Sequence, residues 1–378
     1  MKNKKDLELY IHIPFCIRKC KYCDFLSGPS NEKDRQKYVE SLCRKIRSYG
    51  KLAEAYRVVS IFVGGGTPSI LEEEQISQIF RAVYAVFAVE SDAEITLEMN
   101  PGTVTMEKLM AYRRCGINRL SMGLQSTDDR ELEVLGRIHT YETFLESYAL
   151  ARETGFKNIN VDLMSAIPCQ TRESYQKTLK RIAELDPPPE HISAYSLIIE
   201  EGTPFYKRYG DGGHAGELPS EEEERQMYQD TIEVLKKYGY HRYEISNYAK
   251  DGYECRHNLG YWKRTEYLGI GTGAASLIQN RRFTAAKLPE EEWLPEQNVE
   301  ILSVENQMEE TMFLGLRLMK GVSVTEFETK FGRTIESVYG TVIERLKEEK
   351  LLVQDGNYIR LTEHGIDISN YVMSEFLL

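Results

Sequence analysis

The stretch HIPFCIRKCKYCDF, from His12 to Phe25, places Cys16, Cys20 and Cys23 within eight positions. Basic residues stand between the cysteines, which indicates an exposed loop rather than a cluster of core thiols. A structural zinc site usually takes two cysteine pairs, and no second C-x-x-C pair follows here. Three thiolates instead suit an iron-sulfur cluster in which one iron stays open to another ligand. The spacing therefore favours such a cluster over zinc.

Around this stretch, strand-like runs alternate with longer segments of helical spacing. The alternation predicts six β-α units and a parallel sheet, either open or curled into a partial barrel. One helix shows its period clearly, because Ile76, Ile79, Phe80 and Val83 fall on one face. The six strand-like runs are ELYIHI (8–13), VVSIFVGG (58–65), EITLEMN (94–100), RLSMGLQS (119–126), NINVDLM (158–164) and HISAYSLII (191–199).

Polar or glycine residues stand at or near the ends of several runs. The cysteine stretch begins where the first run ends. The carboxyl ends of parallel strands meet at one edge of a sheet, where ligands bind. These positions therefore predict one shared pocket, to which the later runs contribute Gly64, Gly65, Gly66, Glu98, Gln125 and Asp162.

The pattern changes after LPEEEWLPEQ (288–297), which predicts a linker. From Ile301 onward, helical segments lead into two short strands around an Asp355-Gly356 turn, which predicts a small winged-helix-like domain. We therefore expect three parts: a main domain over 1–245, a motif-bearing segment and linker over 246–300, and a C-terminal domain over 301–378.

The 378 residues are 41% hydrophobic and 28% charged, with a net charge of −11, which argues against a nucleic-acid partner. No apolar run reaches the roughly 20 residues that a membrane helix needs, and Asp6 and Glu8 interrupt any signal peptide. We therefore expect a cytoplasmic protein with reduced thiols. Cys43 and Cys115 fit ordinary core positions.

The C-x-x-x-C-x-x-C spacing, on a loop after the first strand of a β-α array, resembles the radical S-adenosylmethionine family. This resemblance implies a partial (β/α)6 TIM-like barrel, a 4Fe-4S cluster on Cys16, Cys20 and Cys23, and S-adenosylmethionine at the open iron. The glycine run could let the backbone approach the cofactor and offer its amide groups. Matching family positions imply cofactor contacts from Tyr10, Tyr22, Gly65, Gly66, Thr67, Glu98, Gln125, Arg137, Asp162 and Ser196.

Within that family the chain is similar to the relatives of oxygen-independent coproporphyrinogen III oxidase, through YIHIPFC (10–16), GGGTPS (64–69), HISAYSLIIEEGTPF (191–205), YEISNYA (243–249) and MFLGLRL (312–318). The oxidase itself has a longer N-terminal extension and a further cysteine where this chain has Phe25. These differences predict that the chain lacks oxidase activity. The alternative is an active radical enzyme of the same group, either a coproporphyrinogen III dehydrogenase or a class C-type methyltransferase.

The segment ECRHNLGYW (254–262) contains the pattern H-N-x-x-Y-W, which resembles the HemW-type haem chaperones. Imidazole is a good axial haem ligand, and aromatic rings can cover a porphyrin face. Without the resemblance, a histidine beside a Trp-Tyr pair is more often a packed, hydrogen-bonded surface group than a haem ligand. The resemblance implies that His257 binds haem, with Cys255 or His241 as further candidates. It also implies haem-accepting apoproteins as partners, including respiratory membrane proteins, with transient membrane association and a homodimer as further expectations.

Three positions depart from the family pattern. Ala166 and Cys169 stand where relatives usually have glycine, and we expect them to crowd the adenosyl side of the pocket. Ala275 stands where many relatives have histidine, which removes a polar group near the haem or the cofactor.

Overall fold

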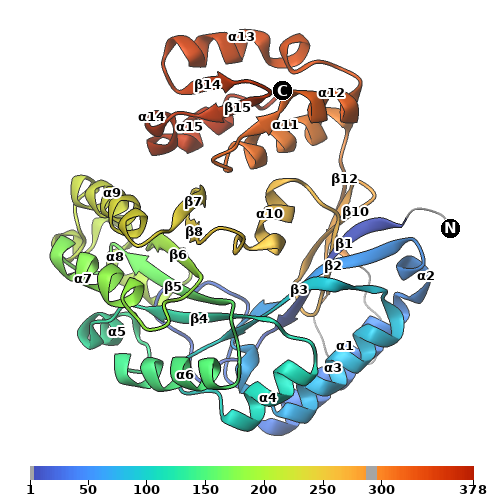
Figure 1. Ribbon diagram of the computed structural model, residues 1–378, viewed down its shortest axis with the longest axis vertical. Coiled ribbons are helices and arrows are strands. Elements are labelled where there is room, and N and C mark those ends of the chain that lie inside the picture. The colour runs from blue at the N-terminus through green and yellow to red at the C-terminus, as the bar shows by residue number, and fades with distance from the viewer. Residues whose placement is uncertain (1–3, 287–295) are drawn as a thin grey trace.

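The computed structural model describes residues 4–286 and 296–378 (Figure 1). Most of the linker expected over 288–297 therefore lies outside the described residues. Six parallel strands form the centre of a twelve-stranded mixed sheet, and they follow one another in chain order, as the alternation predicts. These strands are β1 (Lys5–Ile13), β2 (Tyr56–Gly65), β3 (Val89–Met99), β4 (Arg119–Gln125), β5 (Ile159–Ser165) and β6 (His191–Ser196).

Helices cover the outer face of this curved sheet (Figure 1). In α3 the side chains of Ile76, Ile79, Phe80 and Val83 are buried, which confirms the face expected from their spacing. The covering helices are α1 (Glu32–Ser48), α3 (Glu73–Val86), α4 (Met106–Arg114), α5 (Asp129–Leu135), α6 (Tyr141–Glu153), α7 (Arg172–Ala183) and α9 (Glu221–Lys237). Shorter connections contain α2 (Gly50–Ala53), α8 (Pro204–Tyr209) and the 3-10 turns η1 (Pro68–Ile70), η2 (Gly210–Gly212) and η3 (Ala215–Glu217).

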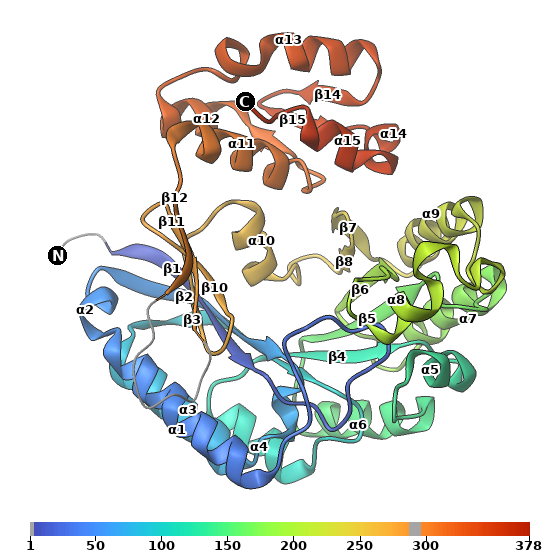
Figure 2. The ribbon, with the colours of Figure 1, turned by 180° about the vertical axis from the view of Figure 1, so that it is seen from behind.

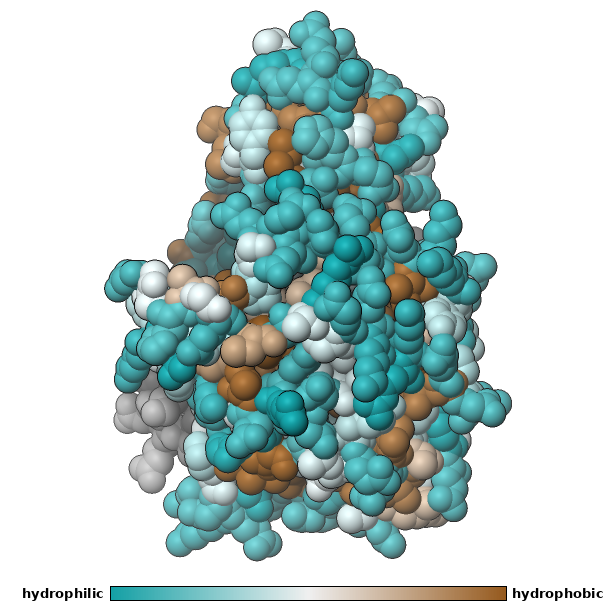
Figure 3. All heavy atoms as spheres, turned by 90° about the vertical axis from the view of Figure 1, so that its left-hand side faces the viewer, coloured by the Kyte–Doolittle hydropathy of each residue, from teal (hydrophilic) through white to brown (hydrophobic). Residues whose placement is uncertain are grey.

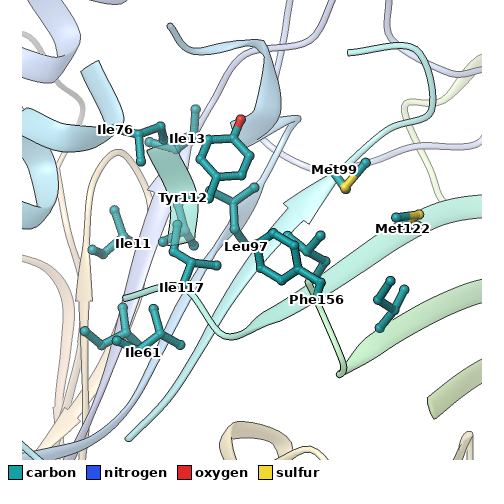
Figure 4. Packing of buried hydrophobic residues seen from close by; sticks show 14 of the residues in the cluster. Ile11, Ile13, Ile61, Ile76, Leu97, Met99, Tyr112, Ile117, Met122 and Phe156 are labelled. Carbon is teal, nitrogen blue, oxygen red and sulfur yellow. The ribbon is translucent and has the colours of Figure 1, made fainter. Parts of the chain in front are cut away.

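The main core lies between the strands and these helices. Ile11 on β1, Ile61 on β2 and Leu97 on β3 pack in one layer beside Ile76 of α3 (Figure 4). Each such side chain contributes roughly 1.5–3 kcal/mol when fully buried. All seven residues of β4 are buried, as expected for a parallel strand in the middle of a covered sheet.

Of the segment expected as a motif and linker, the described residues 246–286 and 296–300 add strands at both edges of the sheet, together with residues 241–244. On one side, β7 and β8 continue from β6 in antiparallel pairing, and on the other side β9 runs parallel to β1. Three further antiparallel strands follow β9. The bounds are β7 (His241–Glu244), β8 (Asn247–Ala249), β9 (Tyr267–Ile270), β10 (Ala275–Ile278), β11 (Arg281–Thr284) and β12 (Gln297–Ile301).

The C-terminal part has its own hydrophobic core and a three-stranded antiparallel sheet, in line with the helices and hairpin expected there. It lies above the open side of the curved sheet, with α10 (Arg256–Trp262) between the two (Figures 1 and 2). Its elements are α11 (Val304–Gly315), β13 (Val322–Ser323), α12 (Val324–Phe331), α13 (Ile335–Glu348), β14 (Leu352–Asp355), β15 (Tyr358–Leu361), α14 (Glu363–Asp367) and α15 (Ser369–Ser374).

In the part of the chain that the structure describes, no helix combines the length and apolarity needed to cross a bilayer. The face of the molecule shown in Figure 3 is largely hydrophilic, and its hydrophobic residues form small separate patches. Isolated apolar residues of this kind are normal on a protein surface.

Candidate functional site

The cysteine loop leaves β1 at the carboxyl edge of the sheet and is held by backbone hydrogen bonds. The amide of Cys16 donates to the carbonyl of Gly28 at 2.9 Å, and the amide of Gly28 donates to Pro14 at 3.1 Å. Farther along, the amide of Lys21 donates to the carbonyl of Leu135 at the end of α5, at 3.0 Å. The loop is therefore anchored at its base and along its length, which restricts where the three thiols can lie.

A cavity of about 560 Å³ opens beside this loop, and we call it the cysteine cavity. Its walls come from the carboxyl ends of strands β2 to β6 and from the loop itself. Its lining includes all but four of the expected site residues: Cys16, Cys20, Tyr22, Cys23, Gly65, Gly66, Glu98, Gln125, Arg137, Asp162 and Ser196. The four that do not line it are Tyr10, Gly64, Thr67 and His257.

Two thiols receive hydrogen bonds from the surrounding protein. The hydroxyl of Thr67 donates to Sγ of Cys16 at 3.5 Å, and Nη1 of Arg137 donates to Sγ of Cys20 at 3.6 Å. Both sulfurs thus accept hydrogen bonds from the protein around them, and one of the donors is a charged guanidinium. Burial raises the pKa of Cys23, the third thiol. Thr67 does not line the cavity, but it contacts the cysteines through its hydrogen bond to Cys16.

The donor set suits a cluster better than a single metal ion. Over residues 4–286 and 296–378, no three His, Cys, Asp or Glu side chains are arranged to hold one metal. A 4Fe-4S cluster does not need such convergence, because each thiolate binds a different iron. All seven cysteines lie in the described ranges, and only Cys16, Cys20 and Cys23 line the cavity, so it has no fourth thiol. The residues present therefore fit a cluster with one open iron.

The amides of the glycine run were expected to face a ligand, but in the structure they donate to protein acceptors. The amide of Gly65 donates to Oε2 of Glu98 at 3.0 Å, and that of Gly66 donates to the carbonyl of Ile13 at 2.8 Å. The amide of Thr67 donates to the carbonyl of Phe15 at 2.7 Å. Gly65 has φ +113°, and a Cβ there would meet the ring of His12 at 2.5 Å. The glycines thus allow the cysteine loop and β2 to approach closely, while their amides stay within the protein.

Two carboxyl groups stand on the wall of the cavity. Burial, together with the charge of Asp162, raises the pKa of Glu98 to about 8. Burial also raises the pKa of Asp162, whose oxygens accept hydrogen bonds from Asn160 at 2.7 Å and Ser121 at 3.4 Å. A ligand with hydroxyl or ammonium donors would favour the charged form of both groups. The wall is therefore suited to a polar, donor-bearing ligand.

Sequence reasoning missed several polar residues of this cavity. Tyr195 donates from its hydroxyl to Oε1 of Gln125 at 2.9 Å, and Gln125 has φ +78° at the end of β4. Alternation along HISAYS could have found Ser193 and Tyr195, because they share a strand face. Asn100 ends the third strand-like run and Asn258 belongs to the H-N-x-x-Y-W pattern, but neither was expected to line this cavity. Asn247 reaches it from a distant segment. The missed residues include Asn100, Ser193, Tyr195, Asn247 and Asn258.

Ala166 and Cys169 were expected to crowd the adenosyl side of the pocket, but the structure does not place them there. Neither residue lines the cysteine cavity. Instead both have left-handed backbone conformations, with φ +58° at Ala166 and +65° at Cys169. Such conformations cost a residue with a Cβ roughly 1–2 kcal/mol relative to the right-handed region. The departures from glycine therefore strain the turn after β5 rather than fill the pocket.

His257 lies in a closed network on the inner side of the sheet. Its Nδ1 is 2.8 Å from Oγ of Ser60 and its Nε2 is 3.0 Å from the hydroxyl of Tyr261. Its ring stacks on Phe62 with centroids 5.3 Å apart, and the residue is only 1% exposed. Burial and the charge of Arg119 lower the pKa of His257 to about 3. The imidazole is therefore neutral, and both of its nitrogens are engaged.

The two other candidate haem ligands, Cys255 and His241, differ from His257 in their burial and partners. Cys255 is fully buried, its Sγ donates to Glu94 at 3.4 Å, and burial raises its pKa to about 12. His241 is partly exposed and pairs with Glu254 at 2.8 Å and Asp251 at 3.2 Å. A protonated, buried thiol is a poor iron ligand, so Cys255 acts here as part of the packing under α10.

A second cavity of about 510 Å³ is lined by residues of the sheet (β1 and β9 to β11), of α10 and of α11. Aromatic residues supply much of its wall, and we call it the aromatic cavity; they are Tyr10, Tyr261, Trp262, Tyr267 and Phe313. Tyr10, expected beside the cluster, thus lines this second cavity, as does the departure Ala275. Helix α10 contributes Asn258 to the cysteine cavity and Tyr261 to the aromatic one.

Comparison with known proteins agrees with this architecture. Residues 10–182 match the radical SAM superfamily, and residues 302–368 match the HemN C-terminal domain. The protein named heme chaperone HemW of Lactococcus lactis subsp. lactis is 36% identical, covering 99% of this chain and 98% of its own. The protein of the same name from Bacillus subtilis is 37% identical, covering 97% of this chain and 98% of its own.

Among solved structures, coproporphyrinogen III oxidase (HemN) from Escherichia coli, described as a radical SAM enzyme, superposes with a TM-score of 0.86. The match covers 99% of this chain and 90% of that one at 24% identity, which shows that the two share a fold. Two full-length relatives above 30% identity, with both family domains in order, establish the family. This chain therefore belongs to the HemW-type branch of the radical S-adenosylmethionine superfamily.

Proposed function

We propose that the protein is a haem chaperone that binds haem and delivers it to haem-accepting apoproteins, without converting coproporphyrinogen. The observation that carries the proposal is full-length similarity to proteins named heme chaperones, combined with the H-N-x-x-Y-W pattern on α10. In this proposal the barrel holds a 4Fe-4S cluster and S-adenosylmethionine, and the C-terminal domain packs over the haem-binding segment.

Cys16, Cys20 and Cys23 would hold the cluster. When bound, the cluster supplies an iron with an open position for the amine and carboxylate of S-adenosylmethionine. Arg137 and Thr67 donate hydrogen bonds to two of the sulfurs that would bind the cluster. Basic side chains on the same loop offset the negative charge that three thiolates bring into a partly buried place.

The remaining lining of the cysteine cavity would hold S-adenosylmethionine. Glu98 and Asp162 can accept hydrogen bonds from the ammonium or the ribose hydroxyls, and ligand donors would keep both carboxyls ionised. Gln125 and Ser196 add neutral polar groups at the ends of β4 and β6. Tyr22 lies on the cysteine loop and closes one side of the cavity.

Haem binding is proposed to involve α10. A neutral imidazole is the form that binds iron, and burial keeps His257 neutral. Both imidazole nitrogens are hydrogen-bonded, so iron binding by His257 would require Tyr261 to move away from Nε2. We therefore propose that haem capture and the rearrangement of this hydrogen bond are coupled.

The proposal is tested with anaerobically reconstituted protein. We expect haem titration to saturate and haem to pass to a respiratory haemoprotein stripped of its own haem. In parallel, coproporphyrinogen should remain unconverted under reducing conditions. Multiple turnovers of coproporphyrinogen would contradict the proposal and favour an active radical enzyme. Production of 5′-deoxyadenosine, measured in the same samples, would report whether S-adenosylmethionine is cleaved.

A further inference from the structure

The aromatic cavity combines an apolar wall with a buried charged cluster. Leu277, Phe313 and Leu314 face it together with the aromatic residues named above. Its volume of about 510 Å³ is typical of a small-molecule site, which usually spans about 300–1,000 Å³. Such sites join an apolar body to a few fixed polar groups. The cavity therefore suits a flat, largely apolar ligand with a polar edge.

One wall of the cavity is built by strand register. Glu8 on β1 pairs with Tyr267 on β9, which pairs with Leu277 on β10, which pairs with Arg282 on β11. Paired residues of neighbouring strands present their side chains on the same face of the sheet. This row therefore places an aromatic ring, an aliphatic side chain and a guanidinium side by side along one rigid surface.

The charged cluster joins the sheet to α11. Nε of Arg264 lies 2.7 Å from one oxygen of Glu310, and Nη2 of Arg282 lies 2.6 Å from the other. Two guanidinium groups thus share one buried carboxylate. Glu300 approaches Arg282 only at 3.8 Å and from an exposed position, where it is screened by water. Burial and the nearby charge of Arg264 also lower the pKa of Lys330 to about 8.

Two donors at this cavity have no acceptor. Nη2 of Arg264 and Nε1 of Trp262 are buried, and neither has a hydrogen-bond partner among the described residues. Arg264 is only 8% exposed, so water does not readily satisfy its guanidinium. Buried donors without acceptors are costly, and a bound ligand with carboxylate oxygens would pair with them.

We infer that the aromatic cavity is a tetrapyrrole-binding site in which Arg264 and Arg282 receive the carboxylate arms and the aromatic wall covers the ring. This inference rests on the proposed haem chaperone function and adds the place of the ligand. Tyr261 lines the cavity and also contacts His257, so a ring bound there lies one side chain away from the imidazole. Recognition of the ring and its arms is then separate from iron ligation.

Two variants test the site by different means. Ala275 is an exposed residue on the cavity wall, so Ala275→Phe fills the cavity without disturbing the core. Arg282→Gln removes one guanidinium. The matched control is Arg281→Gln, because Arg281 lies on the same strand, pairs with Glu296, and does not line the cavity. Circular dichroism and thermal unfolding of each variant check that the fold is retained.

The ligands are haemin and metal-free protoporphyrin, which has the same carboxylates but no iron. For both, we expect Ala275→Phe and Arg282→Gln to weaken binding about tenfold or more, while Arg281→Gln binds as the wild type does. With the dimethyl ester of protoporphyrin, whose arms carry no charge, Arg282→Gln and the wild type should bind equally. Ala275→Phe should still weaken binding of the ester.

The outcomes separate the two proposals. If the wild type binds and transfers haem but both cavity variants bind haemin and protoporphyrin as tightly as the control does, the cavity assignment is overturned and the chaperone function stands. If the wild type binds no haem, both proposals fail. If Arg282→Gln weakens binding of the dimethyl ester as much as binding of the free acid, the assigned role of the guanidinium is wrong.

Discussion

The hydroxyl of Tyr261 lies 3.0 Å from Nε2 of His257, and the two rings meet edge to face with centroids 4.8 Å apart. The other imidazole nitrogen is 2.8 Å from Ser60 on β2. The tyrosine is therefore hydrogen-bonded to the nitrogen that would bind iron in the proposed haem complex. In this structure the histidine expected as a haem ligand has no free nitrogen, because Tyr261, one helical turn away, is hydrogen-bonded to Nε2.

Replacing Tyr261 with phenylalanine should strengthen haem binding. The aromatic wall remains, but Nε2 of His257 loses its buried partner, and an iron ion can satisfy it. A net hydrogen bond of about 1 kcal/mol corresponds to roughly fivefold in affinity. The measurement is haemin titration followed by visible absorbance. The gain should vanish in the double variant Tyr261→Phe, His257→Ala, and an unchanged or lower affinity of the single variant would argue against this relationship.

Loss of one cysteine should prevent cluster assembly. In Cys20→Ala two thiolates remain, and they hold a 4Fe-4S cluster poorly. Iron and sulfide content after anaerobic reconstitution provides the measurement. The control is Cys115→Ala, since Cys115 is buried in the main core and lies outside the cysteine cavity. Normal iron content in Cys20→Ala, or stoichiometric zinc in the wild type, would show that the assignment is wrong.

Haem binding and cluster binding should be separable. His257 reaches the inner side of the sheet from α10, whereas the cysteines lie on the loop after β1. We expect His257→Ala to weaken haem binding with normal iron and sulfide content, and Cys20→Ala to bind haem without a cluster. Both variants should fail to deliver haem, measured by transfer to an apo-haemoprotein. Equal haem affinity of His257→Ala and the wild type would move the ligand assignment to another residue, with His241 the next candidate.

Glu94 should stabilise α10 through its N-terminus. Its carboxylate accepts hydrogen bonds from the amides of Arg256 at 3.1 Å and His257 at 3.2 Å. Glu94→Ala leaves these amides without a partner, so we expect the free energy of unfolding to fall by about 2–3 kcal/mol in urea titrations. Asp92→Ala, on the same strand but exposed, should change it by less than about 0.5 kcal/mol. Equal effects of the two substitutions would refute the capping role.

Glu8 should make stability depend on pH. Burial raises its pKa to about 9, although Ser60 donates a hydrogen bond to it at 3.1 Å. The folded state therefore holds a proton that the unfolded state releases near pH 4.5. Relative to Glu8→Gln, the wild type should lose stability as pH rises from 5 to 9, by at most about 1.4 kcal/mol per pH unit.

This pH dependence is measured as the difference in the free energy of unfolding between the wild type and Glu8→Gln at pH 5, 7 and 9. Asp6→Asn serves as the control, because Asp6 is a solvent-exposed partner of Arg57 and should give a nearly constant difference. A constant difference for Glu8→Gln as well would mean that the carboxyl is ionised in the folded protein.

Much of the cysteine cavity could be predicted from the sequence because its residues sit at strand ends. Strands joined by crossover connections run in the same direction. The carboxyl ends of β1 to β5 therefore all lie at one edge of the sheet. This rule predicts that Cys16, Glu98 and Asp162 share one pocket, and the family resemblance implies what each of them binds. For the glycine run, the sequence predicts close approach of the backbone. It does not predict the partners of the amides, because these depend on the neighbouring segments.

The short strands β9 to β12 carry too few residues for a periodic signal. They join the sheet through β9, which pairs with β1 across more than 250 residues of sequence. The aromatic cavity follows from that pairing and from the docking of α11. The H-N-x-x-Y-W pattern marks Tyr261 and Trp262, but no local pattern predicts the wall opposite them. Residues such as Arg264 and Glu310 read as ordinary surface charges until long-range packing buries them together.

The order of β-α units, the cysteine spacing and the motif on α10 can be read from the sequence, because they depend on residue type and local period. The burial of His257 against Phe62 with both nitrogens engaged, and the carboxylate shared by Arg264 and Arg282, are visible only in the folded chain. Burial and pairing arise from contacts between distant segments, and such contacts set both the charge state of a side chain and its access to a ligand.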